Sequence, residues 1–212
     1  MVGRRALVIA SGADPVGVAA AGEFDLVVCA DGGLDVARAA GCAVDLVVGD
    51  LDSVTPEGLA AADAAGIRVE RHRVDKDESD LELALAAARG AGADCVEVHL
   101  ANGGRLDHQL VNVLVLGSDR WIGASIEARV GEHRIWVVRG AVTLPLDVGD
   151  PVALVAVGGV ARGIVTTGLA YELADEDLDP AEARGIANRV TGPGPTVTVT
   201  TGVLLAISGP ER

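Results

Sequence analysis

The chain has 212 residues, a formal net charge of −14, an apolar content of 50% and an aromatic content of only 2%. This length allows one large domain or two small ones, and a negative field of this size opposes binding to nucleic acid or to an anionic membrane. No apolar run approaches the ~20 residues that a transmembrane helix needs, and no secretory signal peptide is evident. We therefore expect a cytoplasmic protein with neither nucleic acid nor membrane as a partner.

Apolar strand-like runs alternate with Ala-rich stretches through the first half of the chain. We expect strands at 4–11, 25–30, 44–49, 67–72 and 94–100, and helices near 15–22, 33–40, 56–65, 79–91 and 106–117. This alternation predicts a doubly wound, mostly parallel (Rossmann-like) α/β domain over residues 1–122. In such sheets, ligands collect beyond the carboxyl ends of the strands.

The pattern changes after residue 122. Short β-branched runs punctuated by Gly and Pro, among them 125–130, 151–157 and 161–168, recur there at the spacing of an all-β sandwich or barrel, so we expect an all-β domain at 123–212. The acidic segment 173–184 interrupts these runs, and we expect it to form an exposed loop or a turn of helix.

Four successive predicted strands are each followed by a loop that carries aspartate. The loops read "ADGG" (30–33), "GDLDS" (49–53), "DKDESDLE" (75–82) and "NGGRLDH" (102–108). At one edge of a parallel sheet they would bring together seven carboxylates, those of Asp31, Asp50, Asp52, Asp75, Asp77, Asp80 and Asp107. Clustered carboxylates repel one another unless a cation is present, and Mg²⁺ prefers such oxygen ligands together with substrate phosphates. This arrangement is typical of phosphoryl or nucleotidyl transfer.

Glycines and two basic residues in these loops suit a phosphate ligand. Gly32-Gly33 and Gly103-Gly104 would let backbone N–H groups approach a phosphate. Arg105 would bind it through its planar fork and Lys76 as a point charge.

Each of these signals also has a purely structural explanation. An Asp-x-Asp pair after a strand often caps a loop or helix, paired glycines usually mark turns, and Asp80 also suits the first turn of a helix. Four such loops in strand order favour a shared site instead. No GxxxxGK[ST] motif is present, which disfavours a Walker-type kinase.

At these residues the sequence resembles the thiamine pyrophosphokinase (thiamine diphosphokinase) family. "GDLDS", "DKDESDLE" and "GGRLDH" stand in family order with Asn112, and "TGLAYEL" (167–173) and "TGVLLAI" (201–207) are similar to later family segments. The resemblance implies an α/β domain followed by a β domain. It also implies a homodimer that uses Mg²⁺ to transfer pyrophosphate from ATP to thiamine, giving thiamine diphosphate and AMP.

The resemblance assigns roles to the residues of these motifs. The implied metal ligands are Asp50, Asp52 and Asp80, and the implied catalytic residues are these three with Asp107. Asp107 or another of the carboxylates would accept the thiamine hydroxyl proton. The implied nucleotide-binding residues are Asp31, Gly32, Gly33, Ser53, Asp75, Lys76, Asp77, Gly104, Arg105 and Asn112.

One departure concerns the acceptor. The family usually carries a Ser-Asn pair that helps to bind thiamine, but here Ala187 precedes Asn188. Loss of a hydrogen bond to a buried ligand group costs about 1–3 kcal/mol. Two alternatives therefore stay open: the same chemistry on a thiamine analogue, and a non-catalytic sensor that binds thiamine diphosphate or nucleotide.

Overall fold

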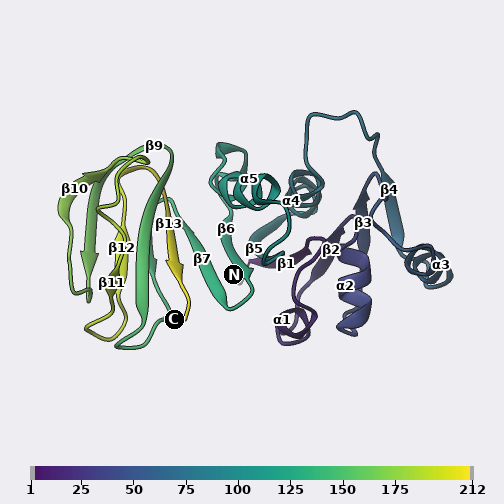
Figure 1. The fold of residues 1–212 in the computed structure, drawn as a ribbon, viewed down its shortest axis with the longest axis horizontal. Helices are drawn as coiled ribbons and strands as arrows, with labels where there is room; N and C mark the ends of the chain where they lie inside the picture. Colours follow the sequence, from purple (N-terminus) through teal and green to yellow (C-terminus); the bar gives the residue numbers. More distant parts are fainter. Residues whose placement is uncertain (1–2, 211–212) are drawn as a thin grey trace. The chain divides into compact units, whose positions relative to one another are not determined.

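The computed structural model describes residues 3–210, which form two compact units (Figure 1). The first unit runs to Val115 and also includes Trp121–Gly131. The second comprises Leu116–Arg120 and the chain from Glu132 onward. In the second unit, the Arg139 guanidinium donates hydrogen bonds to the carbonyl oxygens of Gly117 and Ser118, both at 2.7 Å, and so fixes the short segment.

The first unit is built on six strands that all pair in parallel. They are β1 (Arg4–Ile9), β2 (Leu26–Ala30), β3 (Leu46–Gly49), β4 (Arg68–Arg71), β5 (Ala93–Leu100) and β6 (Ser125–Val130). Their spatial order is β4-β3-β2-β1-β5-β6, which is the arrangement of a doubly wound sheet. The predicted fold class of this half is confirmed.

Helices connect these strands: α1 (Pro15–Ala19), α2 (Gly33–Ala39), α3 (Pro56–Ala64), α4 (Asp80–Gly90) and α5 (Leu106–Leu116). A 3₁₀ turn, η1, follows at Asp119–Trp121. Asp14, Thr55 and Ser79 cap α1, α3 and α4 by accepting hydrogen bonds from first-turn N–H groups, as N-cap side chains do. Apolar side chains from β1, β2, β3 and α2, among them Ile9 and Leu34, form one buried cluster.

The second unit is an antiparallel β structure, as predicted. Its strands are β7 (His133–Val138), β8 (Ala141–Thr143), β9 (Pro151–Thr167), β10 (Ala174–Leu178), β11 (Asn188–Arg189), β12 (Thr196–Thr198) and β13 (Thr201–Ser208). The order is β7-β13-β9-β12-β8, and β10 and β11 also pair with β9. Trp136 and Ile164 lie in its buried core.

Three expectations for the second half need correction. The strand at 125–130 pairs in parallel with β5 and is the last strand of the first unit. The two strands expected at 151–157 and 161–168 form one strand, β9, because Gly158 and Gly159 adopt positive φ angles without ending the pairing. Part of the acidic segment is a strand, β10, which pairs with β9. The division of binding roles between residues 1–122 and residues 123–212 stays a prediction.

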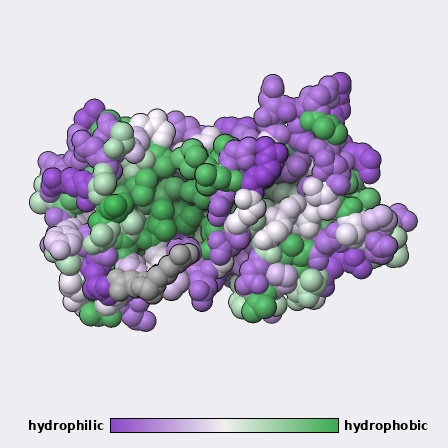
Figure 2. Space-filling model, viewed as in Figure 1, coloured by the Kyte–Doolittle hydropathy of each residue, from purple (hydrophilic) through white to green (hydrophobic). Residues whose placement is uncertain are grey.

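No helix within residues 3–210 combines the length and apolarity needed to cross a membrane. Figure 2 shows apolar side chains gathered over β9, β13 and β7 of the second unit, and hydrophilic side chains around β4 of the first.

Candidate functional site

The carboxyl ends of the parallel strands open into a cavity of about 710 Å³. Its lining comes from the segments after β1, β2, β3, β4 and β5 and from α5. The strand order reverses between β1 and β5, the point at which doubly wound sheets bind ligands. Nine predicted site residues line it: Asp31, Asp50, Asp52, Ser53, Lys76, Asp80, Gly104, Arg105 and Asn112.

The turn after β3 presents two carboxylates to this cavity. Leu51 lies between them with a φ of +69°, and its side chain is buried in the core of the first unit. The Asp52 N–H donates to Asp50 Oδ1 at 3.2 Å, and the Ser53 hydroxyl donates to Asp52 Oδ1 at 2.9 Å. The buried leucine and these hydrogen bonds hold the two acids on the same side of the turn.

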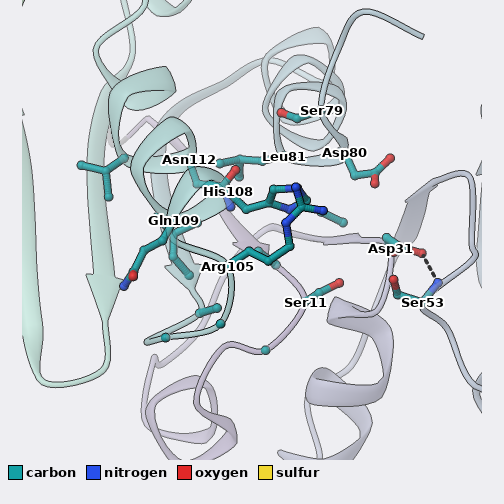
Figure 3. Close-up of a pocket in the computed structure, with 18 of the residues that line it drawn as sticks. Ser11, Asp31, Ser53, Ser79, Asp80, Leu81, Arg105, His108, Gln109 and Asn112 are labelled. Carbon is teal, nitrogen blue, oxygen red and sulfur yellow. Dashed lines mark hydrogen bonds between the residues drawn. The ribbon is translucent and has the colours of Figure 1, made fainter. Parts of the chain in front are cut away.

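Asp31, in the loop after β2, is the most buried of these acids, with 5% of its surface exposed. Its backbone has a φ of +47°, and its N–H donates to the Val48 carbonyl at 2.8 Å. Burial raises the pKa of Asp31 and the charge of Asp80 adds to this, while a hydrogen bond from Ser53 opposes both. Figure 3 shows the contact from the Ser53 N–H, which is 3.4 Å long.

One carboxylate oxygen from each of Asp31, Asp50 and Asp52 lies within 4.8 Å of the others. Three converging oxygens, one of them buried, fit a hard divalent cation such as Mg²⁺. The geometry thus groups Asp31 with Asp50 and Asp52. The ligand set predicted from the sequence, with Asp80 as the third member, stays a prediction.

Asp80 contacts Lys76 instead. The Lys76 ammonium lies 2.9 Å from Asp80 Oδ1 and 3.5 Å from Asp50 Oδ2. Burial acts to lower the pKa of Lys76, but hydrogen bonding and charge from Asp80 and Asp50 raise it overall. Asp80 is also the first residue of α4, which begins with a reciprocal capping box between Ser79 and Glu82.

An exposed ion pair joins Arg105, in the loop before α5, to Asp107 in the first turn of that helix. Two guanidinium nitrogens of Arg105 donate to the two carboxylate oxygens of Asp107 at 3.2 and 2.6 Å. The hydrogen bond from Arg105 lowers the pKa of Asp107 to about 2. Figure 3 shows Arg105 and His108 projecting into the space between α5 and the loops that carry Asp31 and Ser53.

The glycines after β2 have a packing role. A Cβ atom on Gly33 would lie 2.0 Å from the Ile9 carbonyl oxygen, and one on Gly32 would lie 2.8 Å from Ser11 Oγ. These glycines therefore let α2 begin directly against the end of β1. They do not line the cavity.

Three predicted acids also lie outside the cavity lining: Asp75, Asp77 and Asp107. All three are exposed, and Asp75 accepts hydrogen bonds from Arg73. Conversely, the cavity includes residues that were not selected from the sequence: Ser11, Gly12, Ser79, Asn102, His108 and Gln109. Ser11 and Gly12 lie in the loop after β1, which carries no aspartate before Asp14, and their position beyond the first strand is the sequence signal that marks them.

The two predicted acceptor residues lie in the second unit, in the lining of a cavity of about 270 Å³. Ala187 has a φ of +58°. The Asn188 side chain accepts a hydrogen bond from the Tyr171 N–H at 3.0 Å and donates one to the Tyr171 carbonyl at 2.8 Å. Asn188 thus holds the turn after β9, a role the sequence did not reveal.

Two models of one protein family match the chain. "Thiamin pyrophosphokinase, catalytic domain" matches residues 20–121, and "Thiamin pyrophosphokinase, vitamin B1 binding domain" matches residues 133–204. The first contains the carboxylates of the large cavity, and the second contains Ala187 and Asn188.

Individual relatives carry the same name. A thiamine pyrophosphokinase of Bacillus subtilis is 34% identical over 68 residues, which are 32% of this chain and 32% of that protein. The crystal structure of thiamine pyrophosphokinase from Bacillus subtilis has a TM-score of 0.84 at 22% identity and covers 99% of this chain and 100% of that one. The crystal structure of thiamin pyrophosphokinase from Geobacillus thermodenitrificans has a TM-score of 0.78 at 24% identity, with 98% of each chain covered. These structures share the fold across both units, and with both domain models matched, the chain belongs to the thiamin pyrophosphokinase family.

Proposed function

We propose that this chain transfers the terminal pyrophosphoryl group of ATP to the hydroxyethyl oxygen of thiamine, giving thiamine diphosphate and AMP. The observation that carries the proposal is the group of Asp31, Asp50 and Asp52 oxygens within 4.8 Å, in the unit matched by the catalytic-domain model. Membership of the family and the match to a vitamin B1 binding domain support thiamine as the acceptor.

Mg²⁺ is the proposed metal, held by Asp50 and Asp52 with either Asp31 or Asp80. Asp31 is favoured as the third ligand by the oxygen distances, whereas Asp80 is favoured by the family motif. When bound, the ion would neutralise negative charge on the phosphates during the transfer.

The remaining cavity residues would bind and orient ATP. Lys76 and Arg105 supply positive charge for the phosphates, and Ser53, Gly104 and Asn112 supply polar contacts. Gly32 and Gly33 would act indirectly by fixing the loop of Asp31. Asp75 and Asp77, which are exposed, have the weakest support as nucleotide ligands.

In the transfer, the thiamine oxygen forms a bond to the β-phosphorus. The bond from that phosphorus to the α,β-bridging oxygen breaks, and its electron pair leaves with AMP. The hydroxyl proton passes to a carboxylate of the site. Asp107 can accept it only weakly while Arg105 holds its pKa near 2, so this role requires that Arg105 move to a phosphate first.

A second candidate function is the same pyrophosphoryl transfer with a thiamine analogue as the acceptor. Ala187 motivates it, because it lacks the hydroxyl that a serine would offer, and the Asn188 amide already binds Tyr171. A non-catalytic sensor has less support, because repelling carboxylates give a pure binder no advantage.

We also propose a homodimer in the cytoplasm. Support for the dimer comes from α5, on which Leu106, Leu110, Val111 and Leu114 are 46–77% exposed, an unusual apolar surface for an isolated chain. The three cysteines, all unpaired in the structure, suit a reducing compartment.

One incubation tests the reaction. The chain is mixed with ATP, Mg²⁺ and thiamine, and AMP and thiamine diphosphate are quantified by chromatography. Parallel incubations with thiamine analogues test the second candidate, for which faster turnover of an analogue than of thiamine would be evidence. Saturable binding without turnover would instead indicate the sensor.

A further inference from the structure

Lys76 is the only lysine of the chain, and its ammonium lies among the acids of the large cavity. It is 2.9 Å from Asp80 Oδ1 and 3.5 Å from Asp50 Oδ2. The side chains of Lys76 and Asp50 are only 14% and 11% exposed. This ion pair is therefore largely shielded from water. In such an environment the Coulomb attraction between opposite charges is stronger than at the protein surface.

Asp50 has two possible cationic partners. It pairs with Lys76, and it also belongs to the group of three carboxylates that fits a divalent cation. An ammonium close to Asp50 repels a second cation there. Lys76 and a free metal ion therefore compete for the same negative charge.

We propose that Lys76 is a resident counter-ion of this site. It neutralises Asp50 and Asp80 before substrates arrive, weakens the binding of free divalent cations, and moves to the phosphates when a metal–nucleotide complex enters. This inference rests on the proposed function. Its consequence is that metal and nucleotide bind together, so that the chain without nucleotide holds little metal.

The position of Lys76 in the chain suits such a movement. It precedes Ser79 and Asp80, where α4 begins, so it lies on a loop outside the helix. Its charge is carried at the end of a flexible four-carbon stem. The ammonium can therefore change partners without a change in α4.

Mn²⁺ binding without nucleotide tests the competition, measured by electron paramagnetic resonance of the free ion. Lys76→Met is expected to bind Mn²⁺ at least about tenfold more tightly than the wild type, since a nearby positive charge is lost. Lys76→Arg keeps the charge and should stay within about threefold of the wild type. Arg38→Met is the matched control, because it removes one positive charge from an exposed ion pair on α2.

Unchanged or weaker Mn²⁺ binding by Lys76→Met would overturn the inference. So would an equal gain in Arg38→Met, because the effect would then come from net charge alone. Thermal unfolding of each variant establishes that the proteins compared are folded.

The wild type gives an independent test that no folding defect can affect. With ¹³Cε-labelled lysine, the protein has a single labelled side chain. Millimolar Mg²⁺ alone should leave its NMR signal nearly unchanged, whereas Mg²⁺ with α,β-methylene-ATP should shift it. A shift to the same final position with Mg²⁺ alone would contradict the inference. If instead the wild type forms no AMP from ATP and thiamine, the proposed function fails, whatever the metal-binding result.

Discussion

At the scale of single residues, the placement of the cavity carboxylates depends on two residues with backbone conformations that non-glycine residues rarely adopt. Asp31 and Leu51 have φ angles of +47° and +69°, each costing roughly 1–2 kcal/mol. Burial of the Leu51 side chain, with 6% exposed, contributes about 1.5–3 kcal/mol in the opposite direction. The core of the first unit thus stabilises a turn that brings carboxylates together, and such local strain is common at functional sites.

Asp52→Asn should abolish turnover and keep the fold. Asp52 is exposed, so the change creates no buried defect, but it removes a charged oxygen ligand from the metal group. We expect AMP formation to fall by on the order of 100-fold or more, with an unchanged melting temperature. Asp63→Asn, an exposed acid on α3, is the matched control. Full activity of Asp52→Asn would remove this residue from the site.

The Asp107 carboxylate should stay ionised to unusually low pH. Its pKa of about 2 in the folded chain lies below the ~3.9 of an unfolded chain. The ion pair with Arg105 therefore favours the folded state above about pH 4 and is lost as the pH falls toward 2. In a ¹³C NMR titration, Arg105→Met should raise the pKa of Asp107 toward its ordinary value, and Arg73→Met should not. An Asp107 signal that titrates near pH 4 in the wild type would refute the pairing.

The sequence predicted that acids converge, but it did not show how they group. Strand order alone indicated that seven aspartates share an edge. Four of them, Asp31, Asp50, Asp52 and Asp80, line the cavity, whereas Asp75, Asp77 and Asp107 do not. Which carboxylate oxygens come together depends on the left-handed backbone of Asp31 and Leu51 and on the ion pair between Asp80 and Lys76. Neither feature follows from the spacing of residues in the sequence.

At the scale of elements, α2 begins against β1 because Gly33 has no side chain. Gly33→Ala would bring a Cβ atom within 2.0 Å of a backbone oxygen that cannot move away alone. We expect a loss of ~3 kcal/mol or more in the free energy of unfolding, measured by urea denaturation. Gly90→Ala, in α4 with open space around it, should instead gain about 0.5–1 kcal/mol. Equal effects of the two changes would contradict this role for Gly33.

The central strands β1, β2 and β3 and the helix α4 were predictable because each carries a clear apolar pattern and buries it in the first unit. β10 was not, because only Leu178 among its residues is buried. Its pairing with β9 is accompanied by an ion pair between Arg162 and Asp177 at 2.6 Å. An edge strand of this kind forms because it pairs with a neighbouring strand, here β9. The local sequence of β10 gives no information about that pairing.

At the scale of the whole molecule, the exposed apolar face of α5 bears on assembly. Leu110→Glu with Leu114→Glu should convert the proposed dimer into monomers, because buried charges would oppose the interface. Light scattering during size-exclusion chromatography measures the mass. Val16→Glu, which places the same charge on an exposed residue of α1, should leave the dimer intact. A wild type with the mass of one chain would exclude the dimer.

The two units carry the two halves of the proposed reaction, a carboxylate cavity in the first and a vitamin B1 binding domain match in the second. The most direct measurement follows the products formed from ATP, Mg²⁺ and thiamine by the purified wild-type chain. We predict AMP and thiamine diphosphate in equal amounts, with formation abolished when EDTA removes the metal. ADP with thiamine monophosphate, or no conversion of thiamine by the folded protein, would contradict the account.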